Sequence, residues 1–313
     1  MSHPVALSSQ RSLVARIFIS PSERRLRAGW RLLMQTLMMF AILSIMAILM
    51  GMLFAHLSAL KQGFSTSLML TLGEFVSFLA VTLSIYLARR WLDRRSLTSL
   101  GVKWDHLAPR DLLMGIGLAG AMIALIFLTE WALGWLVFQG FAWDFRSLDA
   151  LLLSLVYSAL LFVGVGWTEE LLSRGYWLQN LSEGINLTCG VLLSSFLFAL
   201  AHLSNPNFSW MALLGLFASG LFFAFAYLRT GQLWLPIGLH IGWNFFEGSV
   251  FGFQVSGLEM ERLILQEVHG PAFFTGGGFG PEAGLILFPV LLLTSWVIYH
   301  YTRDRIPKMP KNP

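Results

Sequence analysis

The chain contains eight runs of about 20 apolar residues, and these runs restrict its fold more than any other feature. A helix of roughly 20 apolar residues is long enough to cross the hydrocarbon core of a bilayer. The runs lie at about 32–57, 67–88, 112–138, 150–178, 186–204, 209–228, 233–252 and 283–301. We therefore expect an all-α fold, a polytopic bundle of transmembrane helices with about eight spans.

The composition agrees with this class of protein. Charged residues make up 12% of the chain, whereas a soluble domain has roughly 25%. The pI of about 9.5 does not indicate nucleic-acid binding, because the basic residues stand at the ends of the apolar runs rather than on a long polar face. The single cysteine, Cys189, excludes an intramolecular disulfide and a metal site built from several thiolates.

The positions of the basic residues predict how the bundle is oriented. Cytoplasmic segments of membrane proteins are rich in Lys and Arg. With a cytoplasmic N-terminus, 18 of the 21 Lys and Arg residues fall on the cytoplasmic side, and only Lys61, Arg146 and Arg262 fall on the other. We therefore expect both termini in the cytoplasm, in a multi-pass protein of a bacterial-type plasma membrane.

The chain divides into four parts on this basis. We expect a basic cytoplasmic segment at 1–31, a three-span region at 32–138 and a core at 150–252 that contains the polar motifs. The last part, 253–313, holds an extracytoplasmic loop, the last span and a basic tail. The glycine-rich stretch in 253–280 predicts a flexible loop, because no strand or Lys-Ser pair accompanies it as in a phosphate-binding loop.

Three polar groups lie within the apolar runs of the core. They are Glu169, Glu170 and Arg174 in the fourth run, His202 in the fifth, and His240 and Asn244 in the seventh. An ionised side chain at the centre of a membrane helix costs roughly 2.5–3.5 kcal/mol on the insertion scale, so such residues are candidates for function.

The spacing within each group predicts how its side chains point. Glu170 and Arg174 are four residues apart, so they share a helix face and are able to pair. Glu169 is turned about 100° away from Glu170, which leaves its carboxylate free for chemistry. His240 and Asn244 also share one face.

The groups are also expected to lie at one depth. A turn at 182–186 is midway between Glu169 and His202, so both residues lie about 24 Å from it in a helical hairpin. His240 lies about 12 Å beyond the turn at 230–232. If the helices are neighbours and the first turn protrudes from the membrane, all three side chains form one layer on the cytoplasmic side.

The order Glu-Glu-x-x-x-Arg, Phe-x-x-x-His and His-x-x-x-Asn, each on its own apolar helix, resembles the CAAX-protease and bacteriocin-processing (CPBP, or ABI) intramembrane peptidases. The resemblance covers about 150–250. It implies an endopeptidase in which Glu169 is the general base, while Glu170 and Arg174 shape the acidic pair. His202, His240 and Asn244 would then position water, stabilise the oxyanion or bind a metal.

The resemblance leaves the type of mechanism open. Glu169, His202 and His240 could hold a divalent metal such as zinc with one open position, although no His-Glu-x-x-His helix is present. A carboxylate in an apolar pocket is equally suited to metal-free acid–base chemistry, and we favour that mechanism. The implied partners are membrane lipids and a membrane-associated or lipid-modified peptide or protein.

Other interpretations compete with the peptidase. The acidic pair and Arg174 could be a structural ion pair at a helix end. A proton-coupled transporter could use the same groups as a relay, but the chain shows no repeat between its halves. A non-catalytic membrane scaffold of the same fold is a third alternative. Glu74, Glu130 and Glu247 are further acids in apolar runs, for which we expect structural hydrogen bonds, with Glu247 the nearest to the site.

Overall fold

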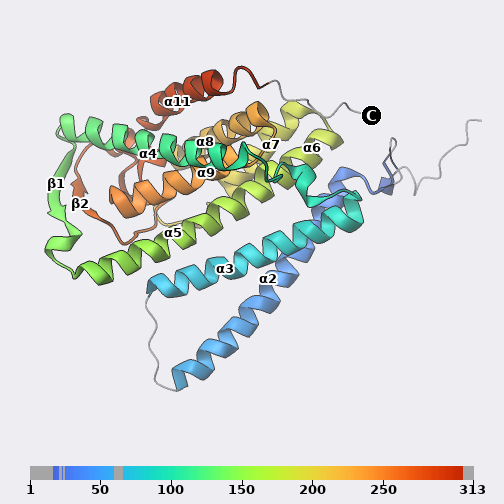
Figure 1. The fold of residues 1–313 in the computed structure, drawn as a ribbon, viewed down its shortest axis with the longest axis horizontal. Helices are drawn as coiled ribbons and strands as arrows, with labels where there is room; N and C mark the ends of the chain where they lie inside the picture. The colour runs from blue at the N-terminus through green and yellow to red at the C-terminus, as the bar shows by residue number, and fades with distance from the viewer. Residues whose placement is uncertain (1–16, 21–22, 24, 60–65, 306–313) are drawn as a thin grey trace, which may run out of the picture.

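A computed structural model describes residues 17–20, 23, 25–59 and 66–305, and these residues form a bundle of helices (Figure 1). The long helices are α2 (Ala28–Ala59), α3 (Thr66–Leu87), α4 (Ala108–Ala132), α5 (Leu148–Glu170), α6 (Leu178–Gly184), α7 (Leu187–Leu200), α8 (Trp210–Thr230), α9 (Trp234–Asn244) and α11 (Leu287–Tyr301). Each predicted apolar run overlaps one of these helices, while the short α6 falls between the fourth and fifth runs. The two chain ends lie outside the described residues, and with them the predicted cytoplasmic termini.

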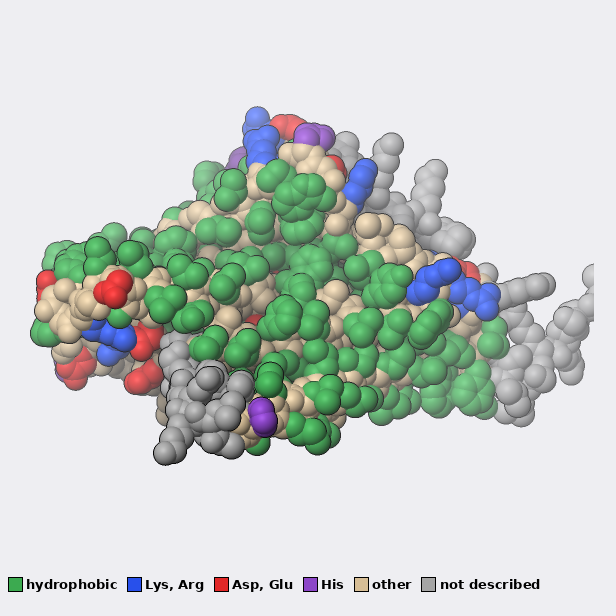
Figure 2. Space-filling model, turned by 60° about the horizontal axis from the view of Figure 1, so that its bottom comes forward, with side chains coloured by type: hydrophobic (Ala, Val, Ile, Leu, Met, Phe, Trp, Pro, Cys, Tyr) green, Lys and Arg blue, Asp and Glu red, His purple; other side chains and the backbone are tan. Residues whose placement is uncertain are grey.

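Five helical segments among the described residues are long and apolar enough to cross a membrane. They are Ala28–His56, Leu68–Asp93, Ala108–Ala132, Leu148–Gly184 and Trp210–Thr230, and α7 and α11 are shorter apolar helices. The face shown in Figure 2 is covered mainly by hydrophobic side chains, with charged side chains gathered near its edges. The chain is an integral membrane protein, in which these exposed apolar side chains face lipid rather than water.

The all-α prediction is wrong in one detail. Strand β1 (Leu136–Phe141) pairs antiparallel with β2 (Ile264–Val268), with a bulge between Phe138 and Gly140. The apolar run at 112–138 therefore does not stay helical to its end. The helix stops at Ala132, Gly134 adopts a positive φ of 71°, and the β-branched and aromatic residues that follow favour a strand.

The predicted flexible loop at 253–280 is also wrong, because this segment is folded and packed. It contains β2, the short helix α10 (Ala272–Thr275) and a 3₁₀ turn at Gly277–Phe279, and Phe279 is buried. Its glycines permit close approach of the backbone. Gly276 has φ +85°, and a Cβ there would lie 1.7 Å from the carbonyl oxygen of Gly280.

Helix α9 lies at the centre of the bundle and is buried from Leu235 to Asn244. Glycines bring it against α4. A Cβ on Gly238 would lie 2.1 Å from the Leu112 carbonyl oxygen, and one on Gly115 would lie 2.5 Å from the Leu235 carbonyl oxygen. Small residues at such contacts let membrane helices approach closely. The apolar composition of α9 therefore reflects burial inside the protein.

Among the described residues, three helices change from α to π geometry near their ends. The π segments are Ala88–Asp93 after α3, Leu171–Trp177 between α5 and α6, and Phe245–Val250 after α9. The second follows Glu170 and the third follows Asn244, so two of the three adjoin predicted site residues. π turns are rare in proteins and are frequent at functional sites.

An ionic cluster ties the start of α2 to the end of α6. Glu183 accepts hydrogen bonds from Arg25 at 3.0 Å and from Arg31 at 2.8 Å, and it also pairs with Arg95. Arg31 binds Asp93 at 2.6 Å. The cluster joins α2, the end of α3 and α6 at one end of the bundle.

We predict that Gly238→Ala destabilises the protein, whereas Gly117→Ala does not. The added methyl group at Gly238 would clash with the backbone of α4, and such overpacking typically costs about 1–3 kcal/mol. A methyl group at Gly117 meets nothing within 4 Å, and alanine improves helix propensity by about 1 kcal/mol. Thermal unfolding of both purified variants in detergent measures the difference. Equal midpoint temperatures of unfolding for the two variants would contradict the close contact between α4 and α9.

Candidate active site

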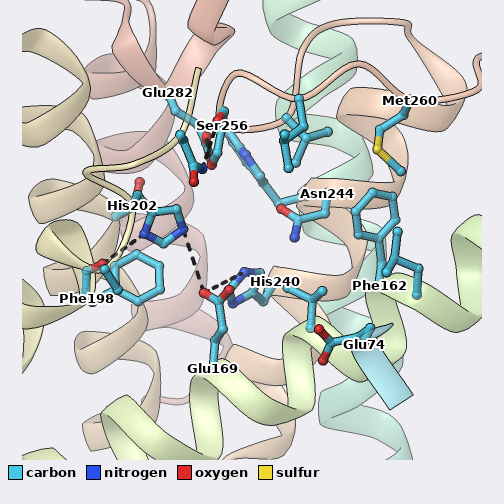
Figure 3. Close-up of a pocket in the computed structure, with 18 of the residues that line it drawn as sticks. Glu74, Phe162, Glu169, Phe198, His202, His240, Asn244, Ser256, Met260 and Glu282 are labelled. Carbon is cyan, nitrogen blue, oxygen red and sulfur yellow. Dashed lines mark hydrogen bonds and ion pairs between the residues drawn. The ribbon is translucent and has the colours of Figure 1, made fainter. Parts of the chain in front are cut away.

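Glu169, His202 and His240 meet in one cavity, although they come from three separate segments (Figure 3). The Oε2 atom of Glu169 lies 3.9 Å from Nε2 of His202 and 3.8 Å from Nε2 of His240. These separations exceed a hydrogen bond. Within the described part of the chain, this buried oxygen has no hydrogen-bond partner. The three side chains therefore lie close together, as their predicted common depth requires.

Each histidine is oriented through its other ring nitrogen. Nδ1 of His202 lies 2.9 Å from the carbonyl oxygen of Phe198, and Nδ1 of His240 lies 2.9 Å from Oε1 of Glu170. A carbonyl oxygen and a carboxylate only accept hydrogen bonds, so Nδ1 carries the proton in both rings. Both Nε2 atoms are thus left to face Glu169 and the cavity.

Glu170 and Arg174 form the predicted i,i+4 ion pair, which confirms that geometry. Nη1 of Arg174 donates to Oε1 of Glu170 at 2.7 Å, and both side chains are fully buried. The guanidinium carbon lies 4.3 Å from the centre of the Phe198 ring and 5.0 Å from that of Phe223. Phe223 in turn stacks on His240 with ring centres 5.1 Å apart. The rings of Phe198 and Phe223 therefore hold the Glu170–Arg174 pair in place beside His240.

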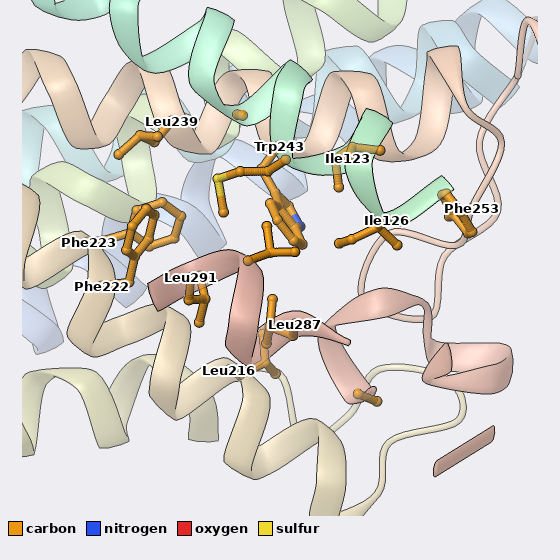
Figure 4. Close-up of a cluster of buried hydrophobic side chains, with 14 of the residues drawn as sticks. Ile123, Ile126, Leu216, Phe222, Phe223, Leu239, Trp243, Phe253, Leu287 and Leu291 are labelled. Atoms are coloured by element: carbon orange, nitrogen blue, oxygen red, sulfur yellow. The ribbon is translucent and has the colours of Figure 1, made fainter. Parts of the chain in front are cut away.

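The cavity has a volume of about 480 Å³ and extends between α3, α5 and α9. Asn244, one turn beyond His240, lines it as the predicted shared face requires, and is largely buried. An apolar core from α4, α8, α9 and α11 adjoins the cavity (Figure 4). This core includes Trp243, Leu239 and Leu291. Protein atoms therefore surround most of the site.

The other acids of the apolar runs differ in their surroundings. Glu74 on α3 accepts a hydrogen bond from the Thr168 hydroxyl at 3.0 Å, as predicted, and it also lines the cavity. Gly164 on α5 makes room for it, because a Cβ there would lie 2.7 Å from Cγ of Glu74. The prediction for Glu130 is wrong. Both of its oxygens are buried without a hydrogen-bond partner among the described residues, because the neighbouring side chains are apolar.

Three further residues line the cavity that no motif predicted: Asn205, Ser256 and Glu282. Ser256 belongs to the segment predicted as a flexible loop, and Glu282 lies just after it. The Asn205 amide donates to the carbonyl oxygen of Ser256 at 2.9 Å. No spacing rule predicts this contact, since it joins segments about 50 residues apart through loop packing.

The arrangement of Glu169, His202 and His240 does not fit a metal ion. Two ligands of one tetrahedral zinc lie about 3.3–3.4 Å apart when each is 2.0–2.1 Å from the ion, and the separations found here are 3.8 and 3.9 Å. Among the described residues, no group of three or more His, Cys, Asp and Glu side chains has the geometry of a metal site.

Comparison with known families supports the resemblance found in the motifs. The segment 151–246 matches the family model described as type II CAAX prenyl endopeptidase Rce1-like. Residues 151–246 are thus similar to that family and are called the Rce1-like segment. It contains Glu169, Glu170, Arg174, His202, His240 and Asn244. The remaining segments, which include α2, α3 and α11, lie outside the match. No curated protein and no solved structure matches the chain.

We predict that Arg174→Met strongly destabilises the protein and that adding Glu170→Gln restores part of the loss. Removing one partner of a buried ion pair leaves an unpaired charge and costs about 3–5 kcal/mol, while the double variant leaves neither charge of the pair. Unfolding of the single and double variants in detergent gives the coupling between the two positions. Additive losses would show that the pair is not coupled.

Proposed function

We propose that the protein is an intramembrane endopeptidase that hydrolyses peptide bonds of membrane-associated or lipid-modified substrates. The observation that carries this proposal is the buried, unpartnered Oε2 of Glu169, which faces the Nε2 atoms of two oriented histidines in one cavity. The Rce1-like segment supports CAAX-type protease activity. Four of the six predicted residues, Glu169, His202, His240 and Asn244, line one cavity, which supports assigning that activity to this site.

In the proposed mechanism, Glu169 is the general base. Its carboxylate accepts a proton from a water molecule while the water oxygen attacks the carbonyl carbon of the substrate. Nδ1 of His202 donates to a carbonyl group, so in the neutral ring Nε2 is the acceptor. In this mechanism Nε2 accepts a hydrogen bond from the same water and positions it. The two groups thus hold the nucleophile from two sides.

The developing oxyanion is stabilised from α9. His240 donates through Nδ1 to the Glu170 carboxylate, and a carboxylate partner favours the imidazolium form. In that form Nε2 also carries a proton that it donates to the oxyanion. The Asn244 amide is a second donor from the same helix face. Preorganised donors of this kind typically contribute about 2.7–4 kcal/mol each to transition-state stabilisation.

We further propose that eight helices lie in the membrane with both chain ends in the cytoplasm. The charge bias of 18 to 3 supports this topology. The described residues agree with it, since the ionic cluster of Arg25, Arg31 and Arg95 lies at the α6 end of the bundle. Arg146 and Arg262 lie near the β1–β2 ribbon at the opposite end (Figure 1). A bacterial-type plasma membrane is the proposed location.

We predict that Glu169→Gln lowers peptide cleavage at least about 100-fold, because removing a general base typically costs 10²–10⁴ in rate. Glu267→Gln is the matched control, since Glu267 is exposed on β2 far from the cavity. Cleavage is followed by comparing membrane proteomes of wild-type and variant cells for precursors that accumulate. Precursors that disappear normally in Glu169→Gln cells, or solute uptake driven by a pH gradient in proteoliposomes, would favour a scaffold or a transporter instead.

We predict that chelators leave the activity unchanged, because the proposed mechanism uses no metal. The purified protein is incubated with a strong zinc chelator, and its metal content and cleavage rate are measured together. Loss of cleavage that is restored by adding one divalent metal would overturn the metal-free mechanism without affecting the assignment of Glu169 to the site.

A further inference from the structure

A carboxyl group outside the Rce1-like segment enters the cavity opposite Glu169. Glu282 lies in the 3₁₀ turn Pro281–Ala283, is only 6% exposed and lines the cavity. In Figure 3, Glu282 and Glu169 lie on opposite sides of His202. Glu282 is also close enough to His202, His240 and Glu169 to interact with them electrostatically. It therefore belongs to the same electrostatic environment as the predicted site residues.

Close packing of the backbone fixes the position of Glu282. Gly215 on α8 lets the backbone approach, since a Cβ there would lie 1.7 Å from the carbonyl oxygen of Glu282. Gly280 has φ +100°, and a Cβ there would lie 2.1 Å from the carbonyl oxygen of Gln254. The hydroxyl of Ser256 donates to Oε2 of Glu282. The glycine-rich segment thus holds one carboxyl group in a fixed place.

The surroundings of Glu282 favour a bound proton. Burial of its carboxyl group and the nearby charge of Glu169 both raise the pKa of Glu282 above its usual value. No Lys or Arg is among the described residues that line the cavity. A carboxyl group that is buried in an apolar setting near another carboxylate favours its protonated form. A carboxylic acid that keeps its proton is a suitable proton donor.

We propose that Glu282 is a further catalytic residue, the general acid that protonates the amine released from the substrate. This inference rests on the proposed peptidase function. Glu169 takes a proton from water as the hydroxide adds to the carbonyl carbon, which gives a tetrahedral oxyanion. The oxyanion then re-forms the carbonyl bond, the C–N bond breaks, and the nitrogen takes the proton of Glu282. A proton passes from Glu169 to Glu282 through water in the cavity and restores both groups.

The test compares two substrates with the same acyl segment, a peptide amide and an activated aryl ester. An amine leaves only when protonated, whereas an aryloxide leaves without a proton. We expect Glu282→Gln to lower kcat for the amide about 100-fold and to leave kcat for the ester nearly unchanged. Glu169→Gln is expected to lower both, and Glu267→Gln neither. Equal losses on both substrates, or an unchanged amide rate, would overturn the role of Glu282.

The outcomes separate the inference from the proposed function. If Glu169→Gln still hydrolyses both substrates, or the wild-type protein hydrolyses neither, the peptidase proposal fails and the role of Glu282 with it. A second measurement does not depend on turnover. The infrared difference between wild-type protein and Glu282→Gln at neutral pH is expected to show the band of a protonated carboxylic acid. A carboxylate band in its place would exclude Glu282 as the proton donor.

Discussion

The buried ion pair between Glu170 and Arg174 is the interaction on which the site depends. One oxygen of Glu170 accepts from Arg174 at 2.7 Å and from His240 at 2.9 Å. A buried ion pair of this kind contributes little net stability compared with apolar packing. Its effect is directional, because it sets which nitrogen of His240 is turned toward Glu169. The neighbouring acids thereby acquire different roles: Glu170 orients a histidine, and Glu169 keeps a free oxygen in the cavity.

The rest of the bundle holds this arrangement in place. Glycines on α4 and α9 bring the two helices close together, so His240 and Asn244 are carried by a helix that is enclosed by protein. Phe198 and Phe223 pack on the guanidinium of Arg174, and Phe223 stacks on His240. Positioning of this kind limits the reorganisation that the polar groups need during a reaction.

Local rules predicted how several of the proposed site residues lie relative to one another. The pairing of Glu170 with Arg174 and the shared face of His240 and Asn244 follow from helix periodicity alone. The approach of Glu169 to His202 follows from counting residues on either side of one turn. Each of these depends on neighbours within one helix or one hairpin, where geometry is set by sequence distance.

Contacts between distant segments could not be predicted in this way. Glu282 reaches the cavity because Gly215 on α8 admits its backbone, a contact between positions 67 residues apart. The glycines at 276–280 predicted a flexible loop, but in the structure they permit close packing of backbone segments. The end of α4 at Ala132 likewise depends on the pairing of β1 with β2, whose partner lies over 120 residues later.

The π segment at Leu171–Trp177 has a consequence for how the long helix from Leu148 to Gly184 is used. An extra residue in a helical turn rotates everything beyond it by about 100° relative to an unbroken α-helix. The part before the segment presents Glu169 to the cavity, and the part after it presents Glu183 to Arg25, Arg31 and Arg95. Because the π segment lies between the two parts, one long helical segment presents side chains to two faces of the molecule. The orientation of each part is therefore independent of the other.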